Sequence, residues 1–160
     1  MPATREDADL ILKLYDMRRE AVMRKARHFM VAEYYAENVQ QFMEKYPPGT
    51  DQNAYFRQAL TYWDMVGAFV NKGLLDAELL FETAAEYYIY WNKARAVVYD
   101  LRKARNLPFY MRNLEDMAGA YKAHMEARSP GCTAFFDSMN RPPSVPARKK
   151  PAKRKKKGSR

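Results

Sequence analysis

A proline-free window from residue 49 to residue 107 most restricts the fold of this chain, because proline interrupts the hydrogen bonding of helices and central strands. All nine prolines lie outside the window. Inside it, apolar side chains recur at three- and four-residue spacing, and no segment shows the sustained alternation of a β-strand. We therefore expect an all-α fold, a bundle of four to five helices with a disordered polybasic C-terminal tail.

Two helices are predicted inside this window. The first begins after Asp51 and ends at Gly73, a residue that suits a left-handed C-cap. It is apolar on two sides, so we expect it at the centre of the bundle, and Gly67 in its middle indicates close approach of a neighbouring helix. The second is capped by Asp76 and is expected to run without a break from residue 77 to about residue 106.

Helical patterns also flank the window. Thr4 can cap a helix at the amide of Asp7, and that pattern continues to residue 46 as one long helix or as two helices with a kink. The Pro47-Pro48-Gly49 run ends it. Pro108 is expected to open a last helix, because the missing proline amide matters little in a first turn, and Ser129-Pro130-Gly131 ends that helix.

The order of residues across the middle of the chain resembles a known family. The residues that carry the resemblance are the run 65–76 (Met-Val-Gly-Ala-Phe-Val-Asn-Lys-Gly-Leu-Leu-Asp), then Trp91, Leu101-Arg102, Leu114-Glu115 and Ala118. They are similar to an uncharacterised bacterial domain family of unknown function, whose members are small and all-helical. The resemblance covers roughly residues 50 to 120 and, more weakly, the first helix. It implies a helical fold and a bacterial source, and it implies no activity, cofactor or catalytic residue.

The charge of the chain is concentrated at its C-terminal end. The net charge is +9, yet residues 141–160 hold ten Lys and Arg residues and no acid, which leaves 18 basic and 19 acidic residues in the first 140. Beyond Met139 the chain has no aromatic residue and nothing to bury, so we expect this segment to be disordered when free. We divide the chain into a helical bundle domain, residues 1–139, and a basic tail, residues 140–160.

Lysine-rich segments of this kind bind phosphate backbones by releasing condensed counterions, without reading the base sequence. We predict a non-enzymatic protein that attaches to DNA or ribosomal RNA through its tail. The alternative is a protein-interaction or membrane-peripheral scaffold whose tail binds anionic lipid, and a solubilising tail with no fixed partner is a third reading. The residues predicted to bind are Arg148, Lys149, Lys150, Lys153, Arg154, Lys155, Lys156, Lys157 and Arg160.

A second basic cluster lies on the first helical segment. It comprises Arg18, Arg19, Arg24, Lys25, Arg27 and His28. It could extend a nucleic-acid footprint, but the body has no net positive charge, so we expect these residues to pair with acids of the bundle. Glu20 is a candidate partner for Arg24, and the row Glu78, Glu82 and Glu86 offers partners for the others.

The remaining candidates give no sign of catalysis. Neither His28 nor His124 completes a Glu-x-x-His motif, so we expect no metal and no cofactor. Cys132 has no histidine neighbour in the sequence, and no phosphate-binding loop or serine-hydrolase motif occurs, so we expect no enzyme. The aromatic run 87–91 is expected to pack in the core, the other readings being a small-molecule pocket or a surface for a protein partner.

The sequence also carries expectations about location. No stretch of about 18 apolar residues occurs, and the N-terminus is charged where a signal peptide needs an apolar segment. The single cysteine fits a reducing compartment. We expect a soluble, cytoplasmic protein.

Overall fold

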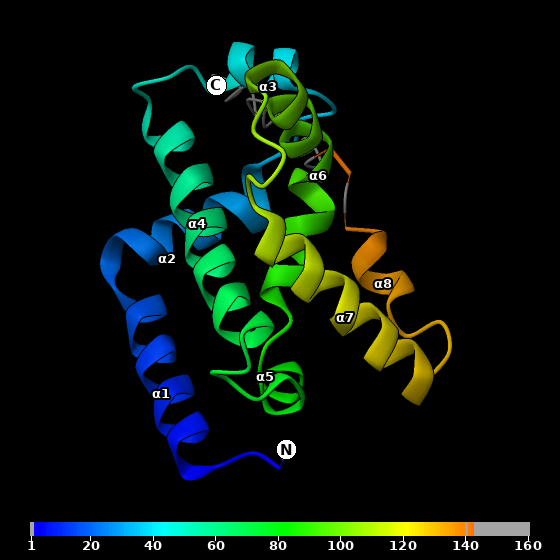
Figure 1. Ribbon diagram of the computed structural model, residues 1–160. Helices are drawn as coiled ribbons and strands as arrows, with labels where there is room; N and C mark the ends of the chain where they lie inside the picture. Colours follow the sequence, from blue (N-terminus) through cyan, green and yellow to red (C-terminus); the bar gives the residue numbers. More distant parts are fainter. Residues whose placement is uncertain (1, 140, 143–160) are drawn as a thin grey trace, which may run out of the picture.

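The computed structural model describes residues 2–139 and 141–142, and within them it contains eight α-helices, one π-helical turn and no β-strand (Figure 1). The helices are α1 (Arg5–Arg19), α2 (Ala21–His28), the π-helical turn η1 (Phe29–Glu33), α3 (Val39–Lys45), α4 (Asp51–Asn71), α5 (Ala77–Thr83), α6 (Glu86–Arg105), α7 (Arg112–Arg128) and α8 (Ala134–Asp137). The predicted all-α fold is confirmed. Its elements are shorter and more numerous than the four to five helices expected, because two of the expected helical segments are interrupted.

Helix α4 lies at the centre of the body, as its two apolar faces predict. It packs against α2 on one side and α7 on the other, and it also contacts α6 (Figure 1). Phe56, Leu60 and Trp63 are buried on one face and Tyr62 on the other. Burial on opposite sides explains why this helix has no wide polar face.

The crossing of α4 and α7 depends on Gly67. A Cβ atom built at this position would lie 2.5 Å from the carbonyl oxygen of Asn113 and 2.7 Å from its carbonyl carbon. Only a residue without a side chain leaves room for the backbone of α7 at this point. The close approach expected from a mid-helix glycine is therefore confirmed. The predicted left-handed C-cap is also present, since Gly73 has a φ of +68°.

The first helical segment is divided at Glu20 and again at residues 34–38, so the prediction of one long helix or two with a kink is wrong. Thr4 caps α1 as predicted, with its hydroxyl accepting from the amide of Asp7 at 3.3 Å. Glu20 then has an extended backbone, with φ −56° and ψ 145°, and its carboxylate accepts hydrogen bonds from the amides of Val22 and Met23. A glutamate that caps the next helix with its own side chain separates α1 from α2.

The uninterrupted helix predicted from residue 77 to residue 106 is wrong. Helix α5 ends at Thr83, and Ala84 has an extended backbone with φ −149° and ψ 142° before α6 begins at Glu86. Alanine favours helices, so Ala84 and Ala85 themselves give no sign of the break. The Thr83 hydroxyl donates to the carbonyls of Leu79 and Leu80, which competes with continuation of the helix.

The start of the last long helix is also corrected. Pro108 lies in a turn, and α7 begins at Arg112, after Met111 in a left-handed conformation with φ +54°. No local side chain caps α7. Instead, the Asp64 carboxylate of α4 accepts from the amide of Leu114 at 2.9 Å. A cap supplied from another helix leaves no mark in the neighbouring sequence.

The aromatic run 87–91 lies in the core, as expected. Tyr87, Tyr88, Tyr90 and Trp91 are buried, and Tyr87 packs edge-on against Tyr121 of α7 with ring centroids 5.4 Å apart. Burial on α6 extends over most of its circumference, because the helix is covered by α7, α3 and α8. The run therefore contributes to packing between helices rather than to an exposed partner surface.

The short helix α8 is fixed to the body by Asp137. Its carboxylate accepts from the Tyr88 hydroxyl at 2.6 Å, from the Asn92 side-chain amide at 3.0 Å and from the Lys122 ammonium at 3.2 Å. Partial burial opposes ionisation, but these hydrogen bonds outweigh it and lower the pKa of Asp137. The end of the helical body is thus attached to both α6 and α7.

Candidate functional site

The residues predicted to bind nucleic acid, from Arg148 to Arg160, lie outside the described residues. The predicted boundary between body and tail, at residue 140, follows closely on the end of α8 at Asp137. The described part of the chain shows how far the charges of the body are matched, and therefore whether the body itself would attract a polyanion.

Some of the basic residues of the described body are paired with its own acids, whereas no ion pair is formed by Arg19, Arg24 or Lys25 of the second basic cluster. Arg18 and Arg27 of the second basic cluster both bind Glu86, and Arg128 lies 3.2 Å from Glu82. The expectation that the acidic row neutralises basic residues is therefore confirmed for these two arginines. The predicted pair of Glu20 with Arg24 is wrong, because Glu20 caps α2 instead.

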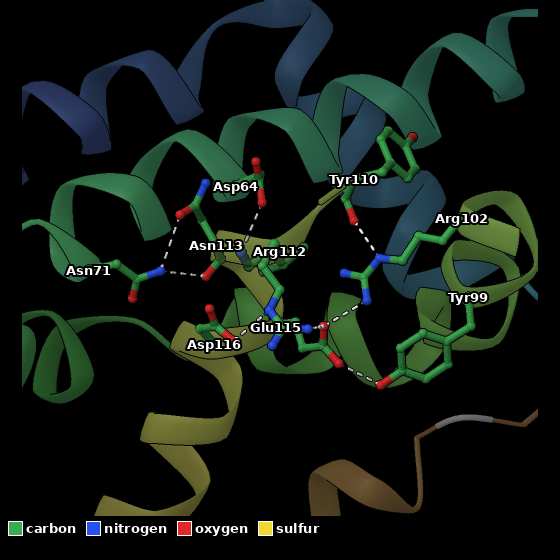
Figure 2. A network of polar contacts seen from close by, with 10 residues as sticks. Asp64, Asn71, Tyr99, Arg102, Tyr110, Arg112, Asn113, Glu115 and Asp116 are labelled. Atoms are coloured by element: carbon green, nitrogen blue, oxygen red, sulfur yellow. Dashed lines mark hydrogen bonds and ion pairs between the residues drawn. The ribbon is translucent and has the colours of Figure 1, made fainter. Parts of the chain in front are cut away.

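Figure 2 shows a second polar network, which joins α6 to the start of α7. The Arg102 guanidinium donates to the carbonyl of Tyr110 and to the carboxylate of Glu115, each at 2.7 Å, and the Tyr99 hydroxyl donates to Glu115 at 2.7 Å. Burial opposes ionisation of Glu115, but the bonds from Tyr99 and Arg102 outweigh it and lower its pKa.

This network is balanced in charge and serves the fold. Arg112 binds both Glu115 and Asp116, so two arginines meet two carboxylates. Asn71 of α4 also donates its side-chain amide to Asn113, at 3.3 Å to the side-chain oxygen (Figure 2). These contacts hold the first turn of α7 against α4 and α6.

A pocket of about 300 Å³ lies between α1, α4 and α5. Its walls are mainly apolar and aromatic, and they include Ile11, Leu14, Tyr15, Tyr62, Trp63 and Leu80. Arg18 is the only charged residue of those that line it. Leu14 is the only buried residue of α1, so this helix leaves space between itself and α4. Pockets of this size and composition are typical of small-molecule sites.

Arg18 is held in the pocket wall by aromatic rings and by one carboxylate. Its guanidinium carbon lies 5.3 Å from the ring centroid of Trp63 and 5.6 Å from that of Tyr15. Its Nη2 lies 2.8 Å from Glu86, while its buried Nε has no hydrogen-bond partner among the described residues. Stacking of this kind fixes the plane of the guanidinium and directs its N–H groups.

Glu86 also binds a second arginine, Arg27. The Nε of Arg27 donates to both of its oxygens, at 3.0 and 3.1 Å, and these bonds raise the pKa of Arg27. The Tyr90 hydroxyl lies 3.5 Å from the same carboxylate. Two guanidinium groups thus share one carboxylate, and the group of Arg18, Arg27 and Glu86 keeps one positive charge beside the apolar pocket.

Lys93 of α6 is a buried cation. Its side chain is 4% exposed, and its ammonium donates to the carbonyl of Val31 at 3.1 Å. Burial lowers the pKa of Lys93 to about 8, because the charged form loses its hydration. The folded protein therefore binds this proton less tightly than the unfolded chain does.

We expect Lys93→Met to stabilise the protein by about 2 kcal/mol at pH 7, where the wild-type ammonium is charged and buried. Between pH 8 and pH 9.5 Lys93 keeps its proton in the unfolded chain and releases it in the folded protein. The free energy of unfolding of the wild type therefore rises, and the difference in stability between the wild type and Lys93→Met shrinks.

Urea denaturation at pH 7 and pH 9.5 measures both effects. Lys103→Met, at an exposed position of α6, is the matched control and should change neither value. A variant that is less stable than the wild type at pH 7 would contradict this account.

The other titratable candidates remain separate from the pocket. Within the described ranges, no group of three or more His, Cys, Asp or Glu residues is arranged to hold a metal ion. Cys132 is a free, partly exposed thiol, and His28 lies 3.3 Å from Glu33. In the sequence Arg18 belongs to a basic cluster, and no pattern there predicts this pocket. The spacing of Tyr15 and Arg18 on one helical face was the only local signal.

No helix of the described chain is long and apolar enough to span a membrane. A family model described as a domain of unknown function (DUF4760) matches residues 3–121. The resemblance to a domain family of unknown function is thereby confirmed, and the match includes the first helix, where the resemblance was weaker. Neither a curated protein nor a solved structure matches the chain.

Proposed function

From the premise that the chain belongs to DUF4760, a domain family of unknown function, we propose that it is a non-enzymatic protein that attaches to the phosphate backbone of DNA or RNA through residues 148–160. The family match ends at residue 121, so it does not cover these residues and the proposal depends on the present chain alone. The body would be the module that is tethered, with a cytoplasmic location in keeping with its single cysteine.

The distribution of charge is the observation that carries this proposal. Ten basic residues and no acid lie in residues 141–160, whereas the first 140 residues are near neutrality. Within the described body, arginines on α1, α2, α6 and α7 are engaged by carboxylates. A polyanion therefore finds the excess positive charge at the C-terminal end of the chain, where counterion release favours binding.

Deletion of residues 141–160 tests the proposal. We expect the full chain to bind duplex DNA or RNA and the truncated chain to lose that binding, with a thermal midpoint nearly unchanged because the truncated chain keeps the described core, which extends to Tyr121. If about eight phosphates are neutralised on duplex DNA, log K should fall against log salt with a slope of about −7. Fluorescence anisotropy of labelled oligonucleotides at several salt concentrations measures both quantities.

A full-length variant with every Lys and Arg of residues 141–160 replaced by Gln is the matched control for chain length. It should behave like the truncated protein. Equal affinity of the wild type and this variant for DNA and RNA would refute the proposal. Tighter binding of the full chain to vesicles of anionic lipid than to nucleic acid at the same salt would favour the alternative of a membrane-peripheral scaffold.

A further inference from the structure

We propose that the pocket between α1, α4 and α5 binds a small amphipathic carboxylate, with its apolar part against Leu14, Trp63 and Leu80 and its carboxylate at Arg18. This inference is independent of the tail and of the proposed attachment to nucleic acid. It depends on the shape of the pocket, its lining and the charge that lies beside it.

The size and lining of the pocket define the apolar part of the ligand. A volume of about 300 Å³ is at the lower end of the range for small-molecule sites and too small for a folded partner. Most of the lining is aliphatic or aromatic, so an apolar group gains by leaving water there. Leu12 and Tyr15 of α1 are 62% and 53% exposed at the rim, and a ligand would cover apolar surface that is otherwise solvated.

The net charge of Arg18, Arg27 and Glu86 indicates the polar group of the ligand. In the network of Figure 2 two arginines meet two carboxylates, whereas here Arg18 and Arg27 share Glu86 alone. One positive charge is unmatched, and a single carboxylate on the ligand would match it. No acid is among the lining residues, and the nearby Glu86 carboxylate is already engaged by both arginines. A cationic amphiphile would meet an unmatched guanidinium and should be rejected.

Arg18 also has donors to spare. A guanidinium carries five N–H groups, and its contact with Glu86 engages one edge of it. The Nε–H has no partner among the described residues, which is a costly state for a buried donor. The rings of Tyr15 and Trp63 hold the group in place, so a carboxylate would meet a guanidinium that is already oriented.

Tryptophan fluorescence tests the inference. The chain has two tryptophans, and Trp91→Phe leaves Trp63 in the pocket wall as the only one, so the signal reports this site and not the tail. The full chain is titrated with decanoate, decanol and decylammonium below their micellar concentrations at physiological salt. We expect a saturable change with decanoate and binding at least tenfold weaker with decylammonium.

Variants of the two neighbouring arginines complete the test. Arg18→Gln should weaken decanoate binding at least tenfold and leave decanol binding unchanged, while Arg18→Lys should retain part of the affinity. Arg19→Gln makes the same change of charge at an exposed position one residue away and should bind decanoate like the wild type. Circular dichroism establishes that each variant is folded. Equal binding of decanoate and decylammonium, an unchanged affinity in Arg18→Gln, or no saturable change with decanoate would each overturn the inference.

Discussion

Replacing Glu86 by alanine is expected to lower the free energy of unfolding by about 3 kcal/mol, because it leaves two guanidinium groups without their shared carboxylate. The Glu86 side chain is 20% exposed and that of Arg18 is 12% exposed, so water can replace the lost partner only in part. Removal of one member of a buried ion pair is more destabilising than the net contribution of that pair, since the remaining charges stay buried.

Chemical denaturation of Glu86→Ala and of Glu82→Ala separates this effect from the loss of a surface charge. Glu82 also contacts an arginine, but its side chain is 52% exposed and that of Arg128 is 56% exposed. Surface pairs of this kind contribute about 0–1 kcal/mol, so Glu82→Ala should be nearly neutral. Equal losses in the two variants would show that Glu86 acts as an ordinary surface residue.

Gly67→Ala is expected to destabilise the protein by about 2–3 kcal/mol, although alanine favours helices more than glycine does. The new Cβ would lie 2.5 Å from a carbonyl oxygen of the α7 backbone, which cannot move aside as a flexible side chain would. The higher helix propensity of alanine stabilises the folded state by about 1 kcal/mol, but the cost of displacing α7 from α4 is larger.

Gly119 provides the matched control for this substitution. It lies within α7 and is exposed, and a Cβ there meets no atom within 4 Å. Gly119→Ala should therefore stabilise the protein by about 0.5–1 kcal/mol through helix propensity alone. The two glycine-to-alanine changes thus have opposite expected signs in thermal or urea unfolding. Stabilisation by both would mean that α7 does not approach α4 as closely as the structure places it.

The sequence predicts those parts of the fold that depend on local chemistry. Thr4, Gly67 and Gly73 act as expected, because a cap, a close approach and a left-handed turn each require a particular residue type at one position. Burial of the aromatic run 87–91 also follows from composition, since a small helical body needs large apolar side chains inside.

The features that the sequence does not predict depend on contacts between distant residues. Ala84 and Ala85 favour a helix, yet the chain breaks there before Glu86, whose partners lie on α1 and α2. Helix α7 begins late because Asp64 of α4 supplies its cap. The pocket needs α1, α4 and α5 to be placed together, so a pattern read along one helix could show Tyr15 and Arg18 but not the cavity beside them.

The three hydrogen bonds accepted by Asp137 fix the point on the body from which the C-terminal segment starts. Because α6 and α7 both hold this carboxylate, the chain leaves the body at one defined place rather than from a fraying end. The twenty-three residues from Ser138 to Arg160 can span at most about 80 Å when fully extended. A polyanion bound at the far end would thus confine the body within that radius and leave its surface free to rotate towards other molecules.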